Sequence, residues 1–190
     1  MEMTELGRLY ARHPARRALL QKIDGKTSGM VFLDGLRASS ASLFFSTLIG
    51  KDDFRRSVLF ILNDREQAAY FYHDLKQILG EQSVMFFPSS YRRAIRFGQK
   101  DNAGEILRTE VLSALSSNAD GRQYAVVTSP DALAEMVVSE RKLNEYSICI
   151  RKGEEYDRDE LQDRLFDMGF EHVDYVYEPG QYALRGSILD

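Results

Sequence analysis

The 190-residue sequence contains one cysteine, Cys149, and only three histidines. A lone cysteine cannot form a disulfide framework or a cysteine-based metal site. The histidines, His13, His73 and His172, lie far apart and form no pair with metal-ligand spacing, so we expect no metal centre. Cys149 falls in the alternating apolar stretch 146–150, which predicts a strand that buries the thiol as a small hydrophobic side chain.

Long apolar runs and an excess of positive charge are also missing. No apolar segment approaches the roughly 20 residues that a membrane-spanning helix needs. Residues 1–20 are charged and helical in pattern, without the apolar region of a signal peptide, so we expect a cytoplasmic protein with no membrane partner. The formal net charge of -4 argues against a domain whose main task is to hold nucleic acid.

The sequence does contain enough apolar material for a folded core, because hydrophobic residues make up 44% of it. Up to about residue 130, short apolar runs alternate with helical patterns, including a helix over 102–116 and one that Asp64 caps. The runs expected to form buried strands are 30–33, 58–62, 84–87 and 124–127. Residues 1–130 are therefore predicted to form an α/β domain with an open parallel sheet.

The pattern changes from residue 131 onwards, where we expect a small α+β module. Its expected elements are a helix at 157–168 and strands at 147–150, 173–177 and 182–189. Residues 178–181, Glu-Pro-Gly-Gln, mark a turn between the last two of these strands. The apolar alternation is still running at Asp190, so we expect a fragment of a longer protein, with an unpaired strand that favours self-association.

The segment 35–42 lies where a phosphate-binding loop would follow the first apolar run. Its residues are Gly35, Leu36, Arg37, Ala38, Ser39, Ser40, Ala41 and Ser42. In the pattern G-x-x-x-x-G-K-[ST], Gly35 matches the first glycine and Ser42 the final hydroxyl. Ser40, however, replaces the second glycine, and Ala41 replaces the lysine.

This segment therefore has the position of a phosphate loop without its chemistry. The missing lysine is the main side-chain cation of phosphoryl transfer, so we expect no ATP hydrolysis, no catalytic residue and no bound cofactor. Arg37 supplies a charge, but from a different position, and a helix N-terminus can hold an anion weakly. An ordinary turn before a helix is the alternative interpretation.

A second basic segment, residues 91–100, interleaves arginines with aromatic residues. Its charges are Arg92, Arg93, Arg96 and Lys100. Such a segment is typical of a loop that contacts nucleic acid. A solvated loop in an otherwise acidic protein is the alternative.

The tail from Gly169 to Asp190 reads GFEHVDYVYEPGQYALRGSILD. It closely resembles the GY-x-x-VD-x-V-x-EPG-x-[FY]-A-x-RG-x-[IL]-LD stretch of bacterial transcription-repair coupling factors and, more loosely, a stretch of the repair protein excinuclease B. The resemblance extends over the whole chain. The segment 35–42 falls at the family's degenerate Walker A, residues 86–88 at its FFP strand end and 126–129 at its VVT strand.

The resemblance implies a role as a scaffold rather than an enzyme. Residues 1–130 would be a degenerate helicase-like domain of P-loop type, a copy of a domain of excinuclease B without its ATPase residues or its lesion-probing hairpin. Residues 131–190 would dock on a second repair protein, excinuclease A, in transcription-coupled nucleotide excision repair. The full-length factor would also bind stalled RNA polymerase and translocate on duplex DNA with ATP, through domains that this chain lacks.

The resemblance also implies partner-binding residues in the tail. Arg185 matches an arginine of the family's polar docking surface, and Gly186 and Tyr182 lie in the same stretch. Glu171 stands where the family has a second arginine, which reverses the charge. The alternative interpretation of Arg185 is a strand-face arginine paired with an acidic neighbour.

Two other functions stay open at the level of the sequence. One is a nucleotide-dependent helicase fragment that uses the Gly35 loop, which Ala41 disfavours. The other is a direct DNA-binding module that uses residues 91–100, which the net acidity disfavours.

Overall fold

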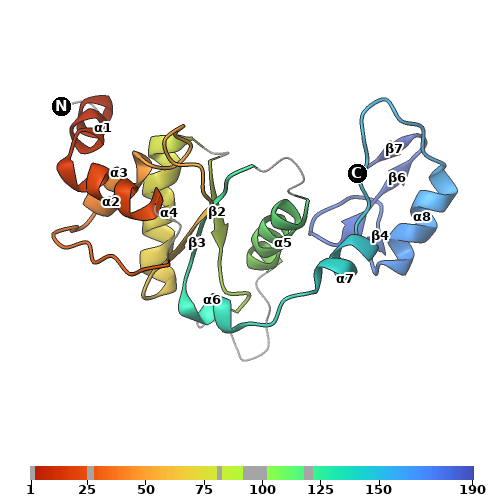
Figure 1. Cartoon of the computed structure of the whole chain (residues 1–190). Coiled ribbons are helices and arrows are strands. Elements are labelled where there is room, and N and C mark those ends of the chain that lie inside the picture. Colours follow the sequence, from red (N-terminus) through yellow and green to blue (C-terminus); the bar gives the residue numbers. More distant parts are fainter. Residues whose placement is uncertain (1–2, 25–27, 81–82, 92–101, 118–121) are drawn as a thin grey trace. The chain divides into compact units, whose positions relative to one another are not determined.

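The computed structural model describes residues 3–24, 28–80, 83–91, 102–117 and 122–190. It is a mixed α/β structure with a small parallel sheet, as the sequence predicts. The chain separates into two compact units, Met1–Met136 and Val137–Asp190 (Figure 1). No helix in the described ranges is long and apolar enough to cross a membrane.

The first unit centres on a three-stranded parallel sheet with the order β1 (Val58–Ile61), β3 (Ala125–Thr128), β2 (Val84–Phe87). Val127 of β3 lies opposite Phe60 of β1 and Phe86 of β2. All four residues of β3 are buried, because this strand has a neighbour on each side and helices over both faces.

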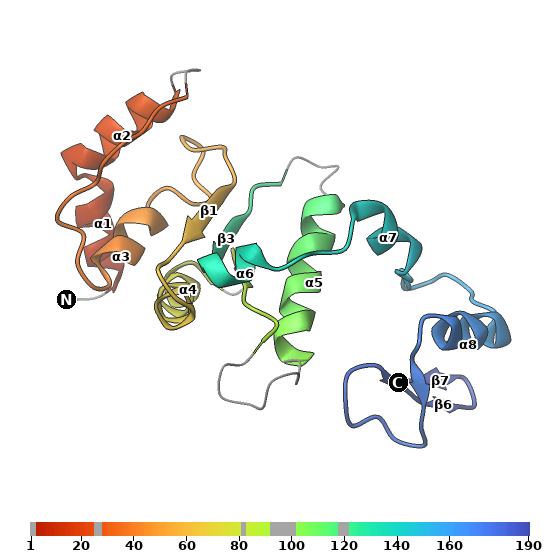
Figure 2. The ribbon, with the colours of Figure 1, turned by 90° about the horizontal axis from the view of Figure 1, so that it is seen from below.

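Helices cover the two faces of this sheet separately (Figures 1 and 2). Helix α4 (Arg65–Leu79) packs its buried side chains on the face that carries Phe60 and Val127. Helix α5 (Asn102–Ser116) covers the opposite face, where Val111 contacts the cluster that contains Val126. Short α6 (Pro130–Ala134) follows β3 directly and adds Ala132 to that cluster.

The ends of α4 follow the expected local signals. The side chain of Asp64 accepts a hydrogen bond from the backbone N–H of Gln67 at 2.8 Å, which satisfies a donor that the first helical turn leaves free. Gly80 ends the helix with φ +90°, a conformation that L side chains rarely adopt. The predicted capped helix is confirmed.

Three helices form a second cluster at the N-terminal side of the first unit: α1 (Met3–Ala11), α2 (Pro14–Asp24) and α3 (Ser40–Ser46). Leu19 of α2 packs with Phe44 of α3 and with the following loop at Phe54. Arg16 ties α2 to that loop, since it forms an ion pair with Asp53 at 2.7 Å and donates to the carbonyl of Thr47 at 3.0 Å.

Two strand predictions for the first unit need correction. Residues 30–33 form no strand, and the side chains of Met30 and Phe32 are exposed. A strand needs a hydrogen-bonded neighbour, and no described strand pairs with this segment. Strand β1 does form, but only one of its faces is buried, because Leu59 and Ile61 are exposed.

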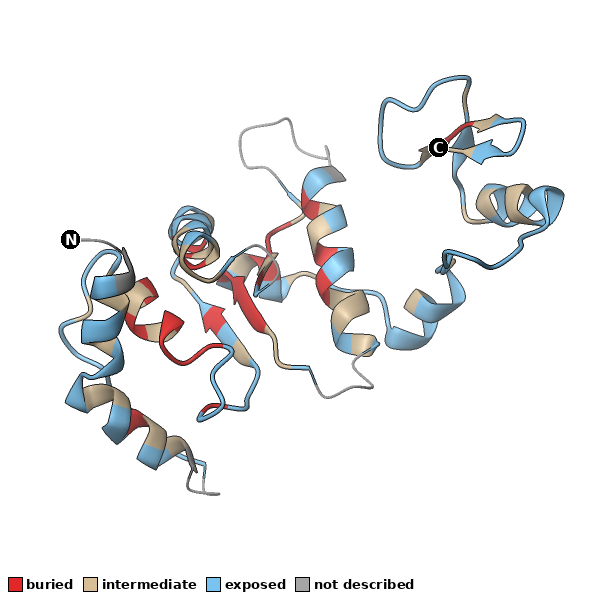
Figure 3. Ribbon diagram, turned by 90° about the horizontal axis from the view of Figure 1, so that it is seen from above, coloured by how far each residue is buried: buried red, intermediate tan, exposed pale blue. Residues whose placement is uncertain are grey.

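The second unit, described throughout, has short elements and little interior. These are α7 (Glu140–Glu145), α8 (Arg158–Asp167), β4 (Glu171–His172), β5 (Gln181–Tyr182), β6 (Leu184–Arg185) and β7 (Ile188–Leu189). Strands β4 and β5 pair in parallel, and β6 and β7 are antiparallel. Only Tyr182 and Ala183 are buried in this unit (Figure 3).

The predicted helix at 157–168 is confirmed as α8, whose first turn is capped by Asp157. The predicted strand at 147–150 is absent, because no neighbouring strand pairs with it. The predicted strand at 173–177 is also absent, because pairing with β5 ends at Val173, whose N–H donates to the Tyr182 carbonyl at 2.9 Å. The predicted strand at 182–189 is divided instead, because a turn folds its second half into the antiparallel β6–β7 hairpin. Cys149 is exposed rather than buried in a strand.

Candidate interaction site

The tail of the second unit presents Arg185 on a tight hairpin. Residues Gly186 and Ser187 join β6 to β7, with Arg185 paired to Ile188. Gly186 has φ +64°, the left-handed conformation that the first position of a two-residue hairpin turn requires. The hairpin closes below the turn, where the backbone N–H of Asp190 donates to the carbonyl of Ala183 at 3.0 Å. The base of the Arg185 side chain is therefore fixed by backbone geometry.

Two neighbours orient the guanidinium of Arg185. It forms an ion pair with Asp190 and lies over the ring of Tyr175, 5.2 Å from the ring centroid. The side chain is still 54% exposed. A guanidinium has five N–H donors, so Arg185 keeps donors for a second acceptor while its neighbours restrict its motion. The acidic neighbour considered from the sequence is thus present, and it leaves the arginine accessible.

Glu171 belongs to a different hydrogen-bond system in the same unit. Its carboxylate accepts from the side-chain amide of Gln181 at 3.3 Å. The carbonyl oxygen of that amide accepts from the backbone N–H groups of Tyr177 and Glu178, at 3.1 and 3.2 Å. Gln181 therefore braces the predicted 178–181 turn, which closes with a bond from Gln181 N–H to the Glu178 carbonyl at 3.3 Å. Glu171 itself is exposed on the surface.

Tyr182 differs from the other predicted partner-binding residues because its side chain is buried, with 3% exposed. Its ring lies 5.1 Å from the ring of His172, on the neighbouring strand β4. Two exposed aromatic residues, Tyr175 and Tyr177, lie on the segment between β4 and β5. The exposed groups of the tail thus include one arginine beside tyrosine rings and carboxylates.

The segment 35–42, the Gly35 loop, lies in the first unit and is held by hydrogen bonds within the unit. Gly35 has φ +83°, and the backbone N–H of Arg37 donates to the Ser40 hydroxyl at 2.6 Å. Ser42, the residue at the final hydroxyl position, is buried, and its hydroxyl donates to the carboxylate of Asp74 in α4 at 3.3 Å. That hydroxyl is thus engaged within the core. Ser39 precedes α3 without a side-chain capping bond, and Ala41 packs against the core of the sheet.

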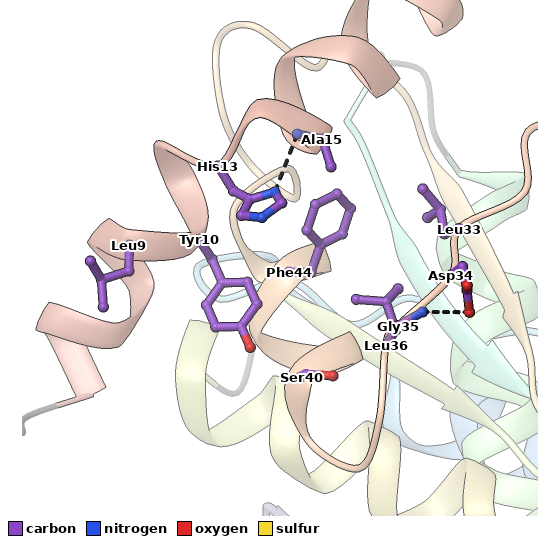
Figure 4. A pocket seen from close by; sticks show the side chains of 10 residues that line it. All are labelled: Leu9, Tyr10, His13, Ala15, Leu33, Asp34, Gly35, Leu36, Ser40 and Phe44. Atoms are coloured by element: carbon purple, nitrogen blue, oxygen red, sulfur yellow. Dashed lines mark hydrogen bonds between the residues drawn. The ribbon is translucent and has the colours of Figure 1, made fainter.

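A cavity of about 440 Å³ lies beside this loop (Figure 4). Side chains of α1, α2 and α3 line it together with residues 33–36, and most of them are apolar. His13 is the only basic residue among them, and its Nδ1 accepts a hydrogen bond from the backbone N–H of Ala15 at 3.2 Å. Asp34 adds a carboxylate, so this cavity offers poor electrostatics for a triphosphate.

The basic segment cannot be placed in the structure, because Arg92, Arg93, Arg96 and Lys100 lie outside the described residues. No cluster of three histidine, cysteine, aspartate or glutamate side chains suited to a metal ion occurs in the parts of the chain that are described.

A charged cluster that the sequence analysis missed lies beyond the carboxyl ends of β2 and β3. Arg108 of α5 is almost fully buried, and its Nη1 lies 3.3 Å from the carboxylate of Glu135. The same nitrogen donates to the carbonyls of Pro88 and Ala132, at 2.9 and 3.0 Å. The guanidinium also lies 4.1 Å from the ring centroid of Phe87. The sequence did contain an indication of this cluster. Arg108 lies three residues before Val111, so on an amphipathic helix both side chains face the core.

Glu135 completes this cluster from the other side. The backbone N–H and hydroxyl of Ser90 donate to it at 3.0 and 2.7 Å, and the Ser89 hydroxyl donates as well. Burial alone would raise the pKa of Glu135, but the hydrogen bonds from Ser89 and Ser90 and the charge of Arg108 outweigh it. The pKa of Glu135 is consequently below the usual value of 4.5.

This lowered pKa predicts an acid-sensitive contribution to stability. A carboxylate whose pKa is depressed by folding stabilises the protein above its unfolded pKa, and the contribution is lost as the pH falls through the folded value. Glu135→Gln should therefore lower the free energy of unfolding at neutral pH, and the difference from the wild type should shrink as the pH falls below the usual glutamate pKa of 4.5. Urea unfolding at neutral and at acidic pH measures this difference in the free energy of unfolding. A difference that does not change with pH would show that the ionised form of Glu135 does not stabilise the fold.

Comparison with known proteins gives one family match and several relatives. Residues 148–190 match the UvrB interaction domain. This range contains Glu171, Tyr182, Arg185 and Gly186, the tail residues predicted to bind a partner.

The relatives are of two kinds. A transcription-repair-coupling factor of Bacillus subtilis is 27% identical over 158 residues, which are 83% of this chain and 13% of that protein. The Escherichia coli protein of the same name is 32% identical over 79 residues, 42% of this chain and 7% of that protein. A UvrABC system protein B of Streptococcus uberis is 21% identical over 181 residues, 90% of this chain and 27% of that protein. The chain thus spans well under a third of each of these relatives.

Proposed function

We propose that this chain, which is similar to the amino-terminal, excinuclease-B-like region of transcription-repair coupling factors, is a binding scaffold for excinuclease A in nucleotide excision repair. The match of residues 148–190 to the UvrB interaction domain supports this role. The observation that carries the proposal is the geometry of Arg185. It is preorganised on a hairpin by Asp190 and Tyr175, and it is accessible.

An arginine in this setting suits recognition of a carboxylate. Its planar guanidinium can present paired N–H donors to both carboxylate oxygens. Holding the side chain in place before binding reduces the conformational entropy that is lost on association. Exposed tyrosines next to an arginine are also a common composition of the energetically important part of an interface.

The first unit would serve as a structural platform in this proposal. Its parallel sheet between helices is compatible with a degenerate helicase-like domain of P-loop type. Ala41 in the lysine position and the engaged Ser42 hydroxyl support a chain that does not hydrolyse ATP. The recruitment of excinuclease A to stalled RNA polymerase, and ATP-driven movement on duplex DNA, would belong to the full-length factor.

The proposal is tested by isothermal titration of the chain against purified excinuclease A. We expect saturable binding that Arg185→Ala weakens by roughly tenfold or more, which corresponds to about 1.4 kcal/mol. Arg158→Ala is the matched control, because Arg158 is exposed in the same unit and pairs with Asp159 on α8.

Each outcome of this titration has a distinct meaning. Equal loss in both variants would indicate a general effect of surface charge rather than a site at Arg185. Absence of binding by the wild-type chain would overturn the proposed function. Tight binding of a nucleotide in a parallel titration would instead favour the helicase-fragment alternative.

A further inference from the structure

The outer edge of β1 is open among the residues that the structure describes. β1 lies at one end of the strand order β1-β3-β2. The N–H of Val58 donates to the Tyr124 carbonyl at 2.8 Å, and that of Leu62 to the Thr128 carbonyl at 2.9 Å. Alternate residues of a strand point their backbone groups to opposite sides. Leu59 and Ile61 therefore direct their N–H and C=O groups away from β3, and no described residue pairs with these groups.

The side chains at this edge are apolar and accessible. Leu59 is 52% exposed and Ile61 is 54% exposed. The cluster that covers their face of the sheet includes residues of β2 and β3 but none of β1. At the other edge of the sheet, by contrast, the ends of β2 are buried at Val84 and Phe87. An apolar strand edge with unpaired backbone groups is a template for another strand.

We propose that β1 pairs in antiparallel fashion with β1 of a second copy of this chain. A two-fold axis at Phe60 places Leu59 opposite the partner's Ile61, and Ile61 opposite the partner's Leu59. These are the residues whose backbone groups point outward, so each pair exchanges two hydrogen bonds. The four apolar side chains then lie side by side on one face of a continuous six-stranded sheet, formed from two three-stranded sheets.

The charges that flank β1 fit the same register. Arg56 lies four residues before Phe60 and Asp64 four residues after it. The two-fold arrangement brings Arg56 toward the partner's Asp64 at both ends of the paired strands. Both side chains are exposed. Opposite charges at such positions favour this register and disfavour a shift along the strand.

The size of the interface sets the expected strength. Two paired strands of four residues bury much less than the roughly 1,200 Å² of a standard stable interface, so the dimer should be weak, with a dissociation constant on the order of tens of micromolar. The pairing involves only the first unit. It stands whether or not the tail binds excinuclease A.

Sedimentation equilibrium of the full 190-residue chain, from about 1 to about 500 µM, tests the proposal. We expect the wild type to change from monomer to dimer over this range. Ile61→Lys places a charge on the shared apolar face and should weaken dimerisation at least about tenfold. Met136→Lys is the control, since Met136 is an exposed apolar residue of the same unit that does not belong to β1, and it should dimerise like the wild type.

A charge variant tests the register independently of the apolar contact. Arg56→Glu sets like charges against each other at both ends of the paired strands. It should weaken the dimer at low salt and approach the wild type at high salt, where exposed charges are screened. Circular dichroism confirms that each variant is folded. A wild type that stays monomeric at all concentrations, or a dimer that Ile61→Lys leaves unchanged, would overturn the proposal.

Discussion

Replacing Arg108 by methionine is expected to lower the free energy of unfolding by about 3 kcal/mol. The substitution keeps most of the volume of the side chain but removes the guanidinium from a site where it is almost fully buried. Glu135 would keep its negative charge with only 15% of its side chain exposed and without its cationic partner. The carbonyls of Pro88 and Ala132 would each lose a donor as well.

The size of this effect follows from the balance inside the cluster. Breaking a buried ion pair by removing one partner costs about 3–5 kcal/mol, mainly because the other charge is left uncompensated. Two features favour the lower end of that range. Ser89 and Ser90 still donate hydrogen bonds to Glu135, and Nη2 of Arg108 is already buried without a hydrogen-bond partner in the described structure. The guanidinium therefore carries a desolvation cost that the variant removes.

Urea unfolding followed by circular dichroism measures the loss, with two comparisons. Arg158→Met removes an exposed arginine whose ion pair with Asp159 should be worth less than about 1 kcal/mol. Combining Arg108→Met with Glu135→Leu should recover part of the lost stability, because no buried charge remains. If Arg108→Met costs no more than Arg158→Met, the ion pair does not stabilise the fold.

Local signals in the sequence predicted several of the helices of this protein. Helix α4 lies between Asp64 and Gly80, both of which act through groups next to them in the chain. Helix α8 begins where Asp157 caps it, and Pro14 opens α2. These features are set by side chains within one helical turn, so a sequence pattern contains the information that fixes them.

Strands were harder to predict because a strand depends on a distant neighbour. The apolar run 30–33 looks like β1 and β2 in composition, yet only the latter two pair with β3. Residues 147–150 alternate in the manner of a strand and remain unpaired, which leaves Cys149 exposed. Periodicity describes how one segment would present its side chains, whereas the hydrogen-bond ladder needs a second segment at the right place.

In the candidate site, too, local features were predictable from the sequence and contacts between separate segments were not. The tail motif identified Arg185, and the hairpin around Gly186 follows from local turn chemistry. No pattern in the sequence indicated that Tyr175 would lie against Arg185, because that contact joins the segment between β4 and β5 to strand β6, ten residues further along the chain. The pairing of Arg108 with Glu135 was hidden for the same reason.

Tyr182→Ala is expected to unfold the second unit and thereby to abolish binding of excinuclease A, whereas Tyr182→Phe should preserve both. Tyr182 and Ala183 are the only buried residues of this unit. Truncating a buried aromatic side chain to alanine costs about 3–5 kcal/mol. A unit as small as residues 137–190 has a total stability of only about that size.

The two substitutions separate a structural role of Tyr182 from direct contact with a partner. Phenylalanine retains the ring that packs on His172 and removes only the hydroxyl, for which the structure shows no hydrogen bond among its described residues. Tyr177→Ala is the control for folding, because Tyr177 is 84% exposed and its loss should leave the exchange protection of the unit unchanged. Hydrogen exchange of residues 137–190 reports folding, and calorimetric titration reports binding. If Tyr182→Ala keeps its exchange protection but loses binding, Tyr182 contacts the partner directly, and the structural explanation is wrong.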